Sequence, residues 1–363
     1  MPRQDAEFLL RNNGDFLLRL TDVKNDMSLV LTLKSDSKCH HLAVMSEKNR
    51  FFFDETHKEH DTASLINFYL NKQKPLVDGT RLVLKKGVTR PVWLLSHDSI
   101  VLSKKLGEGA FGEVYLAECE VESEKQLVAV KTMRSEATRD ARLTFMKEAR
   151  LQRKYSHDHV VRLVGIAVHD QPLMIAMEVC PNGALLSYLR KHKGKLSAAE
   201  KLRFGVESAD GLAYLERQKC IHRDIAARNC LLSAKNEVKI SDFGLSTDQL
   251  AEVHDDTLGK VPVKWLAPEV MSDKLYSLKS DVWAFGILMW EIFSEGTDPY
   301  PGMANIQARA QIIINDYRMQ FPESTPKSVA DTVLHMCWNR LPADRASMSR
   351  IFEKLKELQK TIK

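Results

Sequence analysis

Two acidic side chains and one carboxamide lie at a spacing that suits phosphate chemistry. Asp224 and Asn229 are five residues apart in the run Ile221–Asn229, and Asp242 begins an Asp-Phe-Gly sequence 13 residues after Asn229. The Asp224 carboxylate can accept the proton of an attacking hydroxyl, whereas Asn229 and Asp242 offer the oxygen ligands that Mg²⁺ prefers. This arrangement predicts phosphoryl transfer from ATP held as its Mg²⁺ complex.

The same stretch resembles a family signature. The order His222–Asp224, Asn229, Asp242–Gly244 is similar to protein kinases. The insert Ala226–Arg228 resembles tyrosine kinases, since serine/threonine kinases usually carry a lysine two residues after the aspartate. The resemblance implies that Asp224, Arg228 and Asn229 are catalytic and that Asn229 and Asp242 bind the metal. An ordinary buried core is the alternative, but it would leave the other matching motifs unexplained.

A glycine-rich segment precedes these motifs. Gly107, Gly109 and Gly112 let the backbone approach phosphates without a Cβ in the way. This G-x-G-x-x-G pattern alone is weak, because Rossmann domains share it. Here a strand-like segment ending at Lys131 follows, so we expect Lys131 to hold the nucleotide phosphates and Glu148, on a later helix, to be its ion-pair partner.

Apolar residues should enclose the adenine ring. The resemblance places side chains around the ring, at the gatekeeper position and in the hinge: Leu106, Val114, Ala129 and Leu231 around it, Met177 as gatekeeper, and Glu178 and Cys180 in the hinge. A methionine fills irregular space and would narrow the back of this pocket. The same apolar residues would also suit an ordinary core.

Three further matches concern support and substrate. Asp281 matches the helix residue that anchors the catalytic loop, and Glu269 and Arg345 match a buried ion pair. Removing one partner of such a pair should damage the fold more than the chemistry. The segment Val261–Trp265 resembles the tyrosine-kinase platform, which holds a phenol further from the base than a serine hydroxyl would need.

Composition limits the setting in which the chain works. At 363 residues the chain is long enough for two or three domains, and no apolar run approaches the ~20 residues of a spanning helix. The start is too polar for a signal peptide, and six scattered cysteines suggest reduced thiols. We expect a cytoplasmic monomer that binds no nucleic acid. With a net charge of +5, peripheral association with the plasma membrane stays open.

Residues 1–88 have a pattern of their own. Apolar periodicity predicts helices at 5–11 and 62–70, and alternation predicts strands near 14–19, 28–34, 41–45 and 51–53. The fold class is therefore α+β, with a central antiparallel sheet flanked by two helices. We place a connector at 89–99 and a bilobal protein kinase fold at 100–363.

The run Phe16–Arg19 resembles the F-L-V-R strand of SH2 domains. That resemblance implies that Arg19 binds phosphotyrosine in a bidentate way, with Arg3, Thr21 and His41 around the phosphate and the ring. A strand-end arginine that merely reaches solvent is the plainer alternative for Arg19 alone.

Two departures from the SH2 pattern stand out. The strand that normally opens the domain is missing ahead of the first helix, so a sheet edge would either stay unpaired, at a cost in stability, or be filled by another segment. Asp22 follows closely after Arg19, where a second negative charge would weaken anion binding.

The order of SH2 domain, short connector and tyrosine kinase is most similar to the Fes/Fer family of non-receptor enzymes. The connector Trp93–Leu102 and the segment Gln171–Leu173 carry this resemblance. It implies protein tyrosine substrates, phosphotyrosine-containing partners, and an SH2 domain that supports the active position of the helix bearing Glu148. Src-like kinases are the alternative relatives.

Two features depart from active kinases. No tyrosine lies between Asp242 and Glu269, and His254 stands about where Fes/Fer kinases carry the autophosphorylated one. Asp255 and Asp256 could imitate that phosphate, or could belong to a mobile acidic loop without such a role. Gln152, four residues after Glu148, replaces an apolar residue expected to pack on Phe243 with His222 and Leu163. A buried amide without a partner costs about 1–3 kcal/mol, so we expect a loosely held helix and a low basal activity.

Three functions remain in competition. The leading one is a non-specific protein-tyrosine kinase. A binding scaffold with an inert kinase fold is the runner-up, opposed by the intact Lys131, Asp224 and Asp242. Serine/threonine phosphorylation is opposed by Ala226–Arg228 and by Val261–Trp265.

Overall fold

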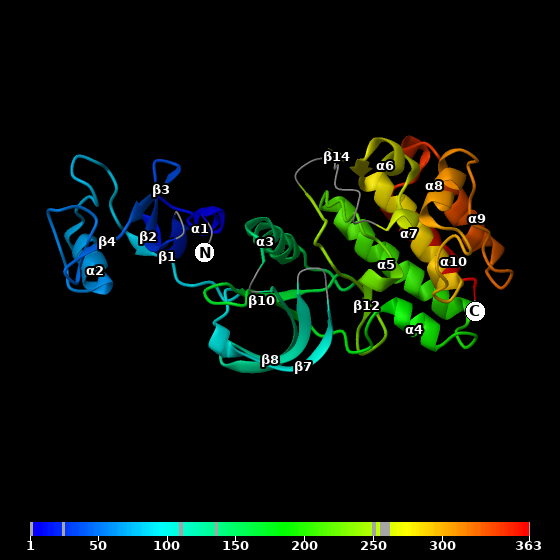
Figure 1. The fold of residues 1–363 in the computed structure, drawn as a ribbon, viewed down its shortest axis with the longest axis horizontal. Helices are drawn as coiled ribbons and strands as arrows, with labels where there is room; N and C mark the ends of the chain where they lie inside the picture. The colour runs from blue at the N-terminus through cyan, green and yellow to red at the C-terminus, as the bar shows by residue number, and fades with distance from the viewer. Residues whose placement is uncertain are drawn as a thin grey trace. The chain divides into compact units, whose positions relative to one another are not determined.

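The chain divides into two compact units (Figure 1). A computed structural model describes residues 3–23, 26–108, 112–134, 137–248, 252–254 and 262–362. The first unit comprises Met1–Ser99 with Ala167–Leu173, and the second comprises Ile100–Ile166 with Met174–Lys363. The connector expected at 89–99 is thus grouped with the first unit.

The first unit is built on a four-stranded sheet in the order β3-β2-β1-β6. Strands β1, β2 and β3 are antiparallel, whereas β6 runs parallel to β1. Its elements are α1 (Arg3–Leu9), β1 (Asp15–Val23), β2 (Asp26–Ser35), β3 (Lys38–Ala43), β4 (Met45–Glu47), β5 (Arg50–Phe52), α2 (Thr62–Lys72), β6 (Lys86–Gly87) and the short η1 (His97–Ser99).

Alternation along β1 separates two small cores. Leu17 packs with Ala6 and Leu10 in one apolar cluster, whereas Phe16 packs with Leu65 and other residues of the second. Because neighbouring strand residues point to opposite faces, α1 and α2 cover opposite sides of the sheet. The predicted sheet flanked by two helices is confirmed.

The edge of β1 has a partner at one end. The register pairs Asp15 with Lys86 and Phe16 with Gly87, and the Val88 N–H donates to the Phe16 carbonyl at 2.7 Å. Of the two alternatives for this edge, the filled one is therefore observed at this end of the strand, where β6 lies beside β1.

The second unit begins with a five-stranded sheet in the order β10-β11-β9-β8-β7. One long helix accompanies it, capped by the Thr138 hydroxyl, which accepts from the Ala141 N–H. The elements are β7 (Ile100–Glu108), β8 (Glu113–Val121), β9 (Glu124–Thr132), α3 (Arg139–Lys154), β10 (Leu163–Ala167) and β11 (Met174–Glu178).

The remainder of the second unit is mainly helical. Its centre is α7, which is buried from Ser280 to Phe293 and begins with a capping box between Ser277 and Ser280. The elements are α4 (Leu185–Lys191), α5 (Ala198–Arg217), η2 (Ala227–Asn229), β12 (Cys230–Leu232), β13 (Val238–Ile240), β14 (Glu252–His254), η4 (Val263–Trp265), α6 (Pro268–Asp273), β15 (Leu275–Ser277), α7 (Leu278–Phe293), α8 (Asn305–Ile313), α9 (Lys327–Met336), η5 (Pro342–Asp344) and α10 (Met348–Gln359). None of the helices in the described ranges is both long enough and apolar enough to cross a bilayer.

A buried ion pair closes the helical part. Arg345 donates to the two Glu269 carboxylate oxygens at 2.7 and 2.8 Å, and also to the carbonyls of Lys279 and Asn339. Only 2% of Arg345 is exposed. The buried ion pair that the sequence predicted for these two residues is therefore present, and the structure shows that it is bidentate.

Replacing this arginine should damage the fold. We expect Arg345→Ala to lower the free energy of unfolding by about 3–5 kcal/mol, because the Glu269 carboxylate is left buried and unpaired. Urea denaturation followed by circular dichroism measures this. The matched control is Arg340→Ala, an exposed neighbour 3.9 Å from Asp316, which should change stability by about 0.5 kcal/mol or less. Similar losses in both variants would contradict the assignment.

Candidate active site

The catalytic loop holds Asp224 by its own side chains. The Asn229 amide donates to the Asp224 carboxylate at 2.7 Å and to its carbonyl at 2.8 Å, and Arg228 forms an ion pair with the same carboxylate. The Asp224 carboxylate keeps partial access to solvent, whereas Asn229 is buried. The three predicted catalytic residues are thus brought together, with one carboxylate oriented by two neighbours.

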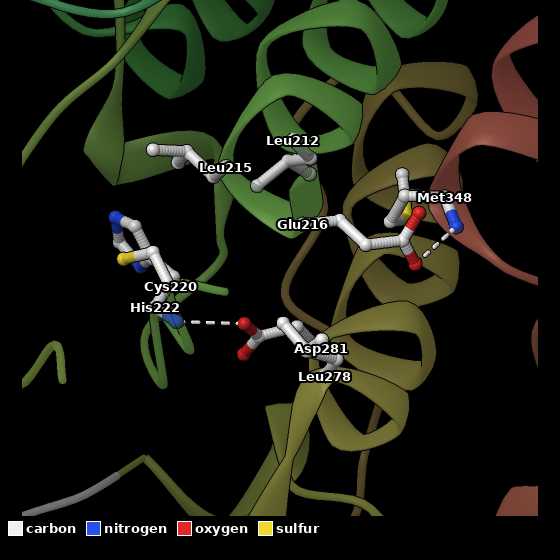
Figure 2. Close-up of a pocket in the computed structure, with 8 residues that line it drawn as sticks. All are labelled: Leu212, Leu215, Glu216, Cys220, His222, Leu278, Asp281 and Met348. Carbon is white, nitrogen blue, oxygen red and sulfur yellow. Dashed lines mark hydrogen bonds between the residues drawn. The ribbon is translucent and has the colours of Figure 1, made fainter. Parts of the chain in front are cut away.

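Asp281 of α7 fixes the start of this loop. Figure 2 shows its carboxylate facing the His222 backbone, whose N–H donates at 2.6 Å; the Arg223 N–H donates at 3.0 Å. Burial raises the pKa of Asp281 to about 6. Arg223 has a φ of 73°, a strained value for a residue with a side chain. The predicted anchor is confirmed, and the same residue borders a small pocket lined by Leu212, Leu215, Glu216, Cys220, His222, Leu278, Asp281 and Met348.

A second α7 carboxylate, which the sequence reasoning missed, holds the other end of the loop. Glu291 accepts from the Ala227 N–H at 3.0 Å and from the Trp265 indole at 2.9 Å. The Arg228 guanidinium lies 4.7 Å from the Trp265 ring centre, a cation–π contact. The loop is thereby joined to η4, the expected substrate platform. A lone acid inside the apolar run of α7 was the signal that could have found Glu291.

The two expected metal ligands lie at the ends of two paired strands: Asn229 directly precedes β12, and Asp242 follows β13 by two residues. Ser241 donates to the Asn229 carbonyl through both its N–H, at 2.9 Å, and its hydroxyl, at 2.8 Å, and Asp242 follows directly. Asp242 is exposed and has a φ of 64°. A carboxylate and a carboxamide fit Mg²⁺, which usually takes one or two carboxylates and completes its shell with water and phosphates. No cluster of three or more His, Cys, Asp or Glu suited to a metal occurs in the part of the chain that the structure describes.

The predicted lysine–glutamate pair is formed. The Lys131 ammonium lies 2.7 and 2.8 Å from the Glu148 carboxylate oxygens and 3.8 Å from Asp242. Burial would lower the pKa of Lys131, but the Glu148 and Asp242 carboxylates outweigh it and raise the pKa. Lys131 therefore remains a cation that can bind phosphate.

The glycine-rich loop contains one position that requires glycine. A Cβ on Gly112 would lie 2.1 Å from the Thr132 carbonyl oxygen, whereas a Cβ on Gly107 would meet nothing within 4 Å. Because Gly112 has no Cβ, the backbone just before β8 can lie close to the Thr132 carbonyl at the end of β9. Gly109 lies outside the described residues.

Several apolar side chains around the expected adenine site stay partly exposed. Leu106 is 50% exposed, while Val114, Ala129, Met177 and Leu231 are half-buried. Ala129 and Leu231 each lie between two fully buried strand neighbours. The register sets Met177 opposite Ala129, and an isolated bridge joins Leu231 to Ala184. An open apolar face of this kind fits a flat aromatic base.

The hinge side chains have different roles. The Glu178 carboxylate accepts from the Arg162 N–H at 2.8 Å and pairs with Lys239 at 3.1 Å, so this side chain is already engaged. The Cys180 thiol is half-buried, and burial raises its pKa to about 12. Contacts with a base at these two residues would therefore come from the backbone.

Gln152 corrects one expectation. Its amide is buried and donates to the Val161 carbonyl at 3.1 Å. The Val161 N–H in turn donates to Ile240, two residues before Asp242, at 2.9 Å. The Phe243 ring packs near Tyr155 at 5.5 Å and His222 at 5.2 Å between ring centres. The unpaired amide that suggested a loosely held helix does not occur, because a backbone carbonyl accepts its hydrogen bond.

Residues Glu252–His254 of the activation segment are held by a strand pair. His254 lies opposite Leu275 in the β14–β15 ladder, and the Arg223 guanidinium lies 4.1 Å from the Tyr276 ring centre. Asp255 and Asp256, the proposed substitutes for a phosphate, lie outside the described residues. Their role stays a prediction.

In the first unit, three of the four expected phosphotyrosine-binding residues form one cluster. The Arg19 Nε donates to the Thr32 hydroxyl at 3.0 Å, and that hydroxyl lies 3.1 Å from His41 Nδ1. His41 Nε2 and Arg3 Nε reach the same Glu7 oxygen at 2.9 and 2.8 Å. We call Arg3, Glu7, Arg19, Thr32 and His41 the Arg19 cluster.

The remaining residues near this cluster are placed less directly. Thr21 is half-buried on β1, two residues after Arg19 and so on the same face. The Asp22 side chain lies outside the described part. The sequence reasoning missed Thr32 and Glu7; a hydroxyl within the apolar run of β2 was a signal for Thr32.

Comparison with known proteins agrees with this geometry. Residues 100–355 match the family "Protein tyrosine and serine/threonine kinase", and residues 1–69 match "SH2 domain". The chain is 53% identical to Fer-related kinase 1 of Caenorhabditis elegans, covering 100% of this chain and 93% of that protein. It is 38% identical to tyrosine-protein kinase Fer of Rattus norvegicus, covering 100% of this chain but 43% of that protein. It is 36% identical to the transforming protein Fps of avian sarcoma virus (strain PRCII), covering 99% of this chain and 67% of that protein.

An SH2 domain followed by a bilobal protein kinase fold is therefore the architecture. The chain belongs to the Fer/Fps family of non-receptor tyrosine kinases.

The Gln152 contact makes a prediction opposite to that of the sequence alone. We expect Gln152→Leu to reduce kinase activity and stability, because the Val161 carbonyl loses its donor at a cost of about 1–3 kcal/mol. Initial rates and thermal melting of the full chain measure both. The control is Lys147→Leu on the exposed face of α3. A rise in activity would contradict this prediction and support the interpretation that α3 is loosely held.

Glu291 predicts a pH dependence of stability. Burial raises its pKa to about 7 in the fold, whereas an unfolded chain has a glutamate pKa of about 4.3. The folded state thus binds more protons between these values, and stability falls as pH rises through them. Relative to wild type, Glu291→Gln should gain about 1–3 kcal/mol of unfolding free energy between pH 5 and pH 8.

A matched variant should show the opposite sign. Burial opposes ionisation of Glu295, but Lys201 and the Gly194 N–H lower its pKa below the ordinary value. Its contribution to stability is present above the unfolded pKa and is lost as pH falls, so Glu295→Gln should lose stability relative to wild type as pH rises. Urea titrations at several pH values test both variants. A pH-independent effect of Glu291→Gln would refute the raised pKa.

Proposed function

We propose that the chain transfers the γ-phosphate of ATP to tyrosine hydroxyls of proteins, as a non-specific protein-tyrosine kinase. The observation that carries this proposal is the pairing of Asp224 with Asn229 and Arg228, with Lys131 and Glu148 paired beside Asp242. These are the groups that phosphoryl transfer needs, and the hydrogen bonds from Ser241 to Asn229 join the two stretches that carry them.

Each residue has a distinct task in this proposal. The Asp224 carboxylate accepts the proton of the tyrosine hydroxyl, and Arg228 and Asn229 keep that carboxylate in position. Lys131 binds the phosphates, and the open apolar face of Val114, Ala129 and Leu231 binds the adenine ring. When bound by Asn229 and Asp242, Mg²⁺ would neutralise phosphate charge.

Tyrosine is favoured as the acceptor because the platform is tied to the catalytic loop. Trp265 of η4 is held by Glu291 and lies under Arg228. An aromatic segment fixed beside the loop sets the distance at which a substrate main chain can bind, and a phenol reaches further than a serine hydroxyl.

We further propose that the SH2 domain binds phosphotyrosine-containing proteins through the Arg19 cluster and supports the active position of α3. The described cysteines are all free, which supports a reducing compartment such as the cytoplasm. A monomer that associates peripherally with anionic membranes is compatible with the net charge of +5.

The deciding experiment is phosphate transfer from Mg²⁺-ATP to a poly-Glu/Tyr substrate. We expect Asp224→Asn to lower the rate by about 10²–10⁴-fold, because the proton acceptor is lost. Thermal stabilisation by Mg²⁺-ATP should persist in this variant and disappear in Asp242→Asn. Equal background rates in wild type and Asp224→Asn would favour a phosphotyrosine-binding scaffold instead.

A further inference from the structure

Glu7 contacts residues that are expected to bind phosphate, although it carries a negative charge. It sits one helical turn after Arg3 on α1, and its side chain is 37% exposed. One oxygen, Oε1, accepts from Arg3 Nε at 2.8 Å and lies 2.9 Å from His41 Nε2. A single carboxylate thus engages two of the residues expected to meet phosphotyrosine.

The hydrogen bonds of the Arg19 cluster run in one direction. Arg19 Nε can only donate, so the Thr32 hydroxyl accepts from it and can donate its own proton to His41 Nδ1. A neutral imidazole with its proton on Nε2 then donates to Glu7. Each donor in this chain meets an acceptor, and the chain ends on the Glu7 carboxylate.

The charges agree with this direction. The hydrogen bond from Arg3 lowers the pKa of Glu7 despite some desolvation, so the carboxylate is ionised. Burial lowers the pKa of His41, although Glu7 opposes this, so the imidazole is neutral. The Arg19 cluster therefore contains two guanidinium cations and one carboxylate.

A phosphate entering this pocket competes with Glu7 for the same donors. Both are oxyanions, and Arg3 can direct its Nε–H to only one of them at a time. A phosphotyrosine dianion placed beside an ionised Glu7 also experiences like-charge repulsion.

We propose that Glu7 is an internal counter-ion of the phosphotyrosine pocket, which the phosphate must displace from Arg3 and His41 on binding. Glu7 thereby weakens phosphotyrosine binding and holds the Arg3 and His41 side chains in place. This inference rests on the proposed phosphotyrosine binding and adds a residue that limits its strength.

Calorimetric titration of the full chain tests the proposal, with free phosphotyrosine and phenyl phosphate as probes in a phosphate-free buffer. Glu7→Gln keeps the size of the side chain and removes the charge. We expect it to bind both probes about tenfold more tightly than wild type does. Thermal melting should show that Glu7→Gln remains folded, since the side chain is partly exposed.

Two variants make the result specific. Glu47→Gln removes a carboxylate that pairs with Lys58 at 2.9 Å on β4, and it changes the net charge by the same amount; its affinity should stay within about twofold of wild type. Arg19→Ala should abolish binding of both probes.

The outcomes distinguish a failure of the counter-ion role of Glu7 from a failure of phosphotyrosine recognition. Unchanged or weaker binding by Glu7→Gln would overturn the counter-ion and make Glu7 a residue that only aligns Arg3 and His41. No binding by wild type would instead reject phosphotyrosine recognition itself. Equal tightening in Glu7→Gln and Glu47→Gln would reduce the effect to net charge and also overturn the proposal.

Discussion

The active site depends on two carboxylates buried in one apolar helix. Asp281 and Glu291 of α7 accept backbone N–H groups from the two ends of the catalytic loop. A loop has no repeating hydrogen bonds of its own, so its backbone donors need partners when they are buried. Because α7 carries an acid at each of these two positions, it fixes the path of the loop backbone. The position of Asp224 follows from that path.

Both units use carboxylates to hold cations or backbone N–H groups, but the carboxylates are buried to different extents. In the kinase unit, carboxylates hold cations and backbone donors that must not move, as in the Lys131–Glu148 pair, which is almost completely buried. In the SH2 unit, Glu7 is partly exposed, and its partners are those that a ligand must engage. The difference follows from burial. An ion pair that water can reach contributes little free energy, so its carboxylate can be replaced by another anion at a small cost.

The sequence predicted those parts of the site that follow from spacing along the chain. Asp224 and Asn229 share a short loop, and Asp242 follows a strand beside it, so their meeting needs little tertiary information. Glu291 meets Ala227 across 64 residues, and that contact depends on how α7 packs. Gln152 was judged from its position on α3, but its partner, Val161, belongs to the segment beyond the helix. Glu7 belongs to the Arg19 cluster because α1 packs on the sheet face that carries Arg19.

The hinge thiol has a consequence for inhibitor chemistry. Cys180 lies in the hinge that is expected to border the adenine site, which would make its thiol a target for an electrophile. Thiolate, not thiol, is the nucleophile, and with a pKa of about 12 this sulfur is almost entirely protonated at neutral pH. Reversible compounds that fill the space beside Met177 are therefore better suited to this enzyme than covalent ones.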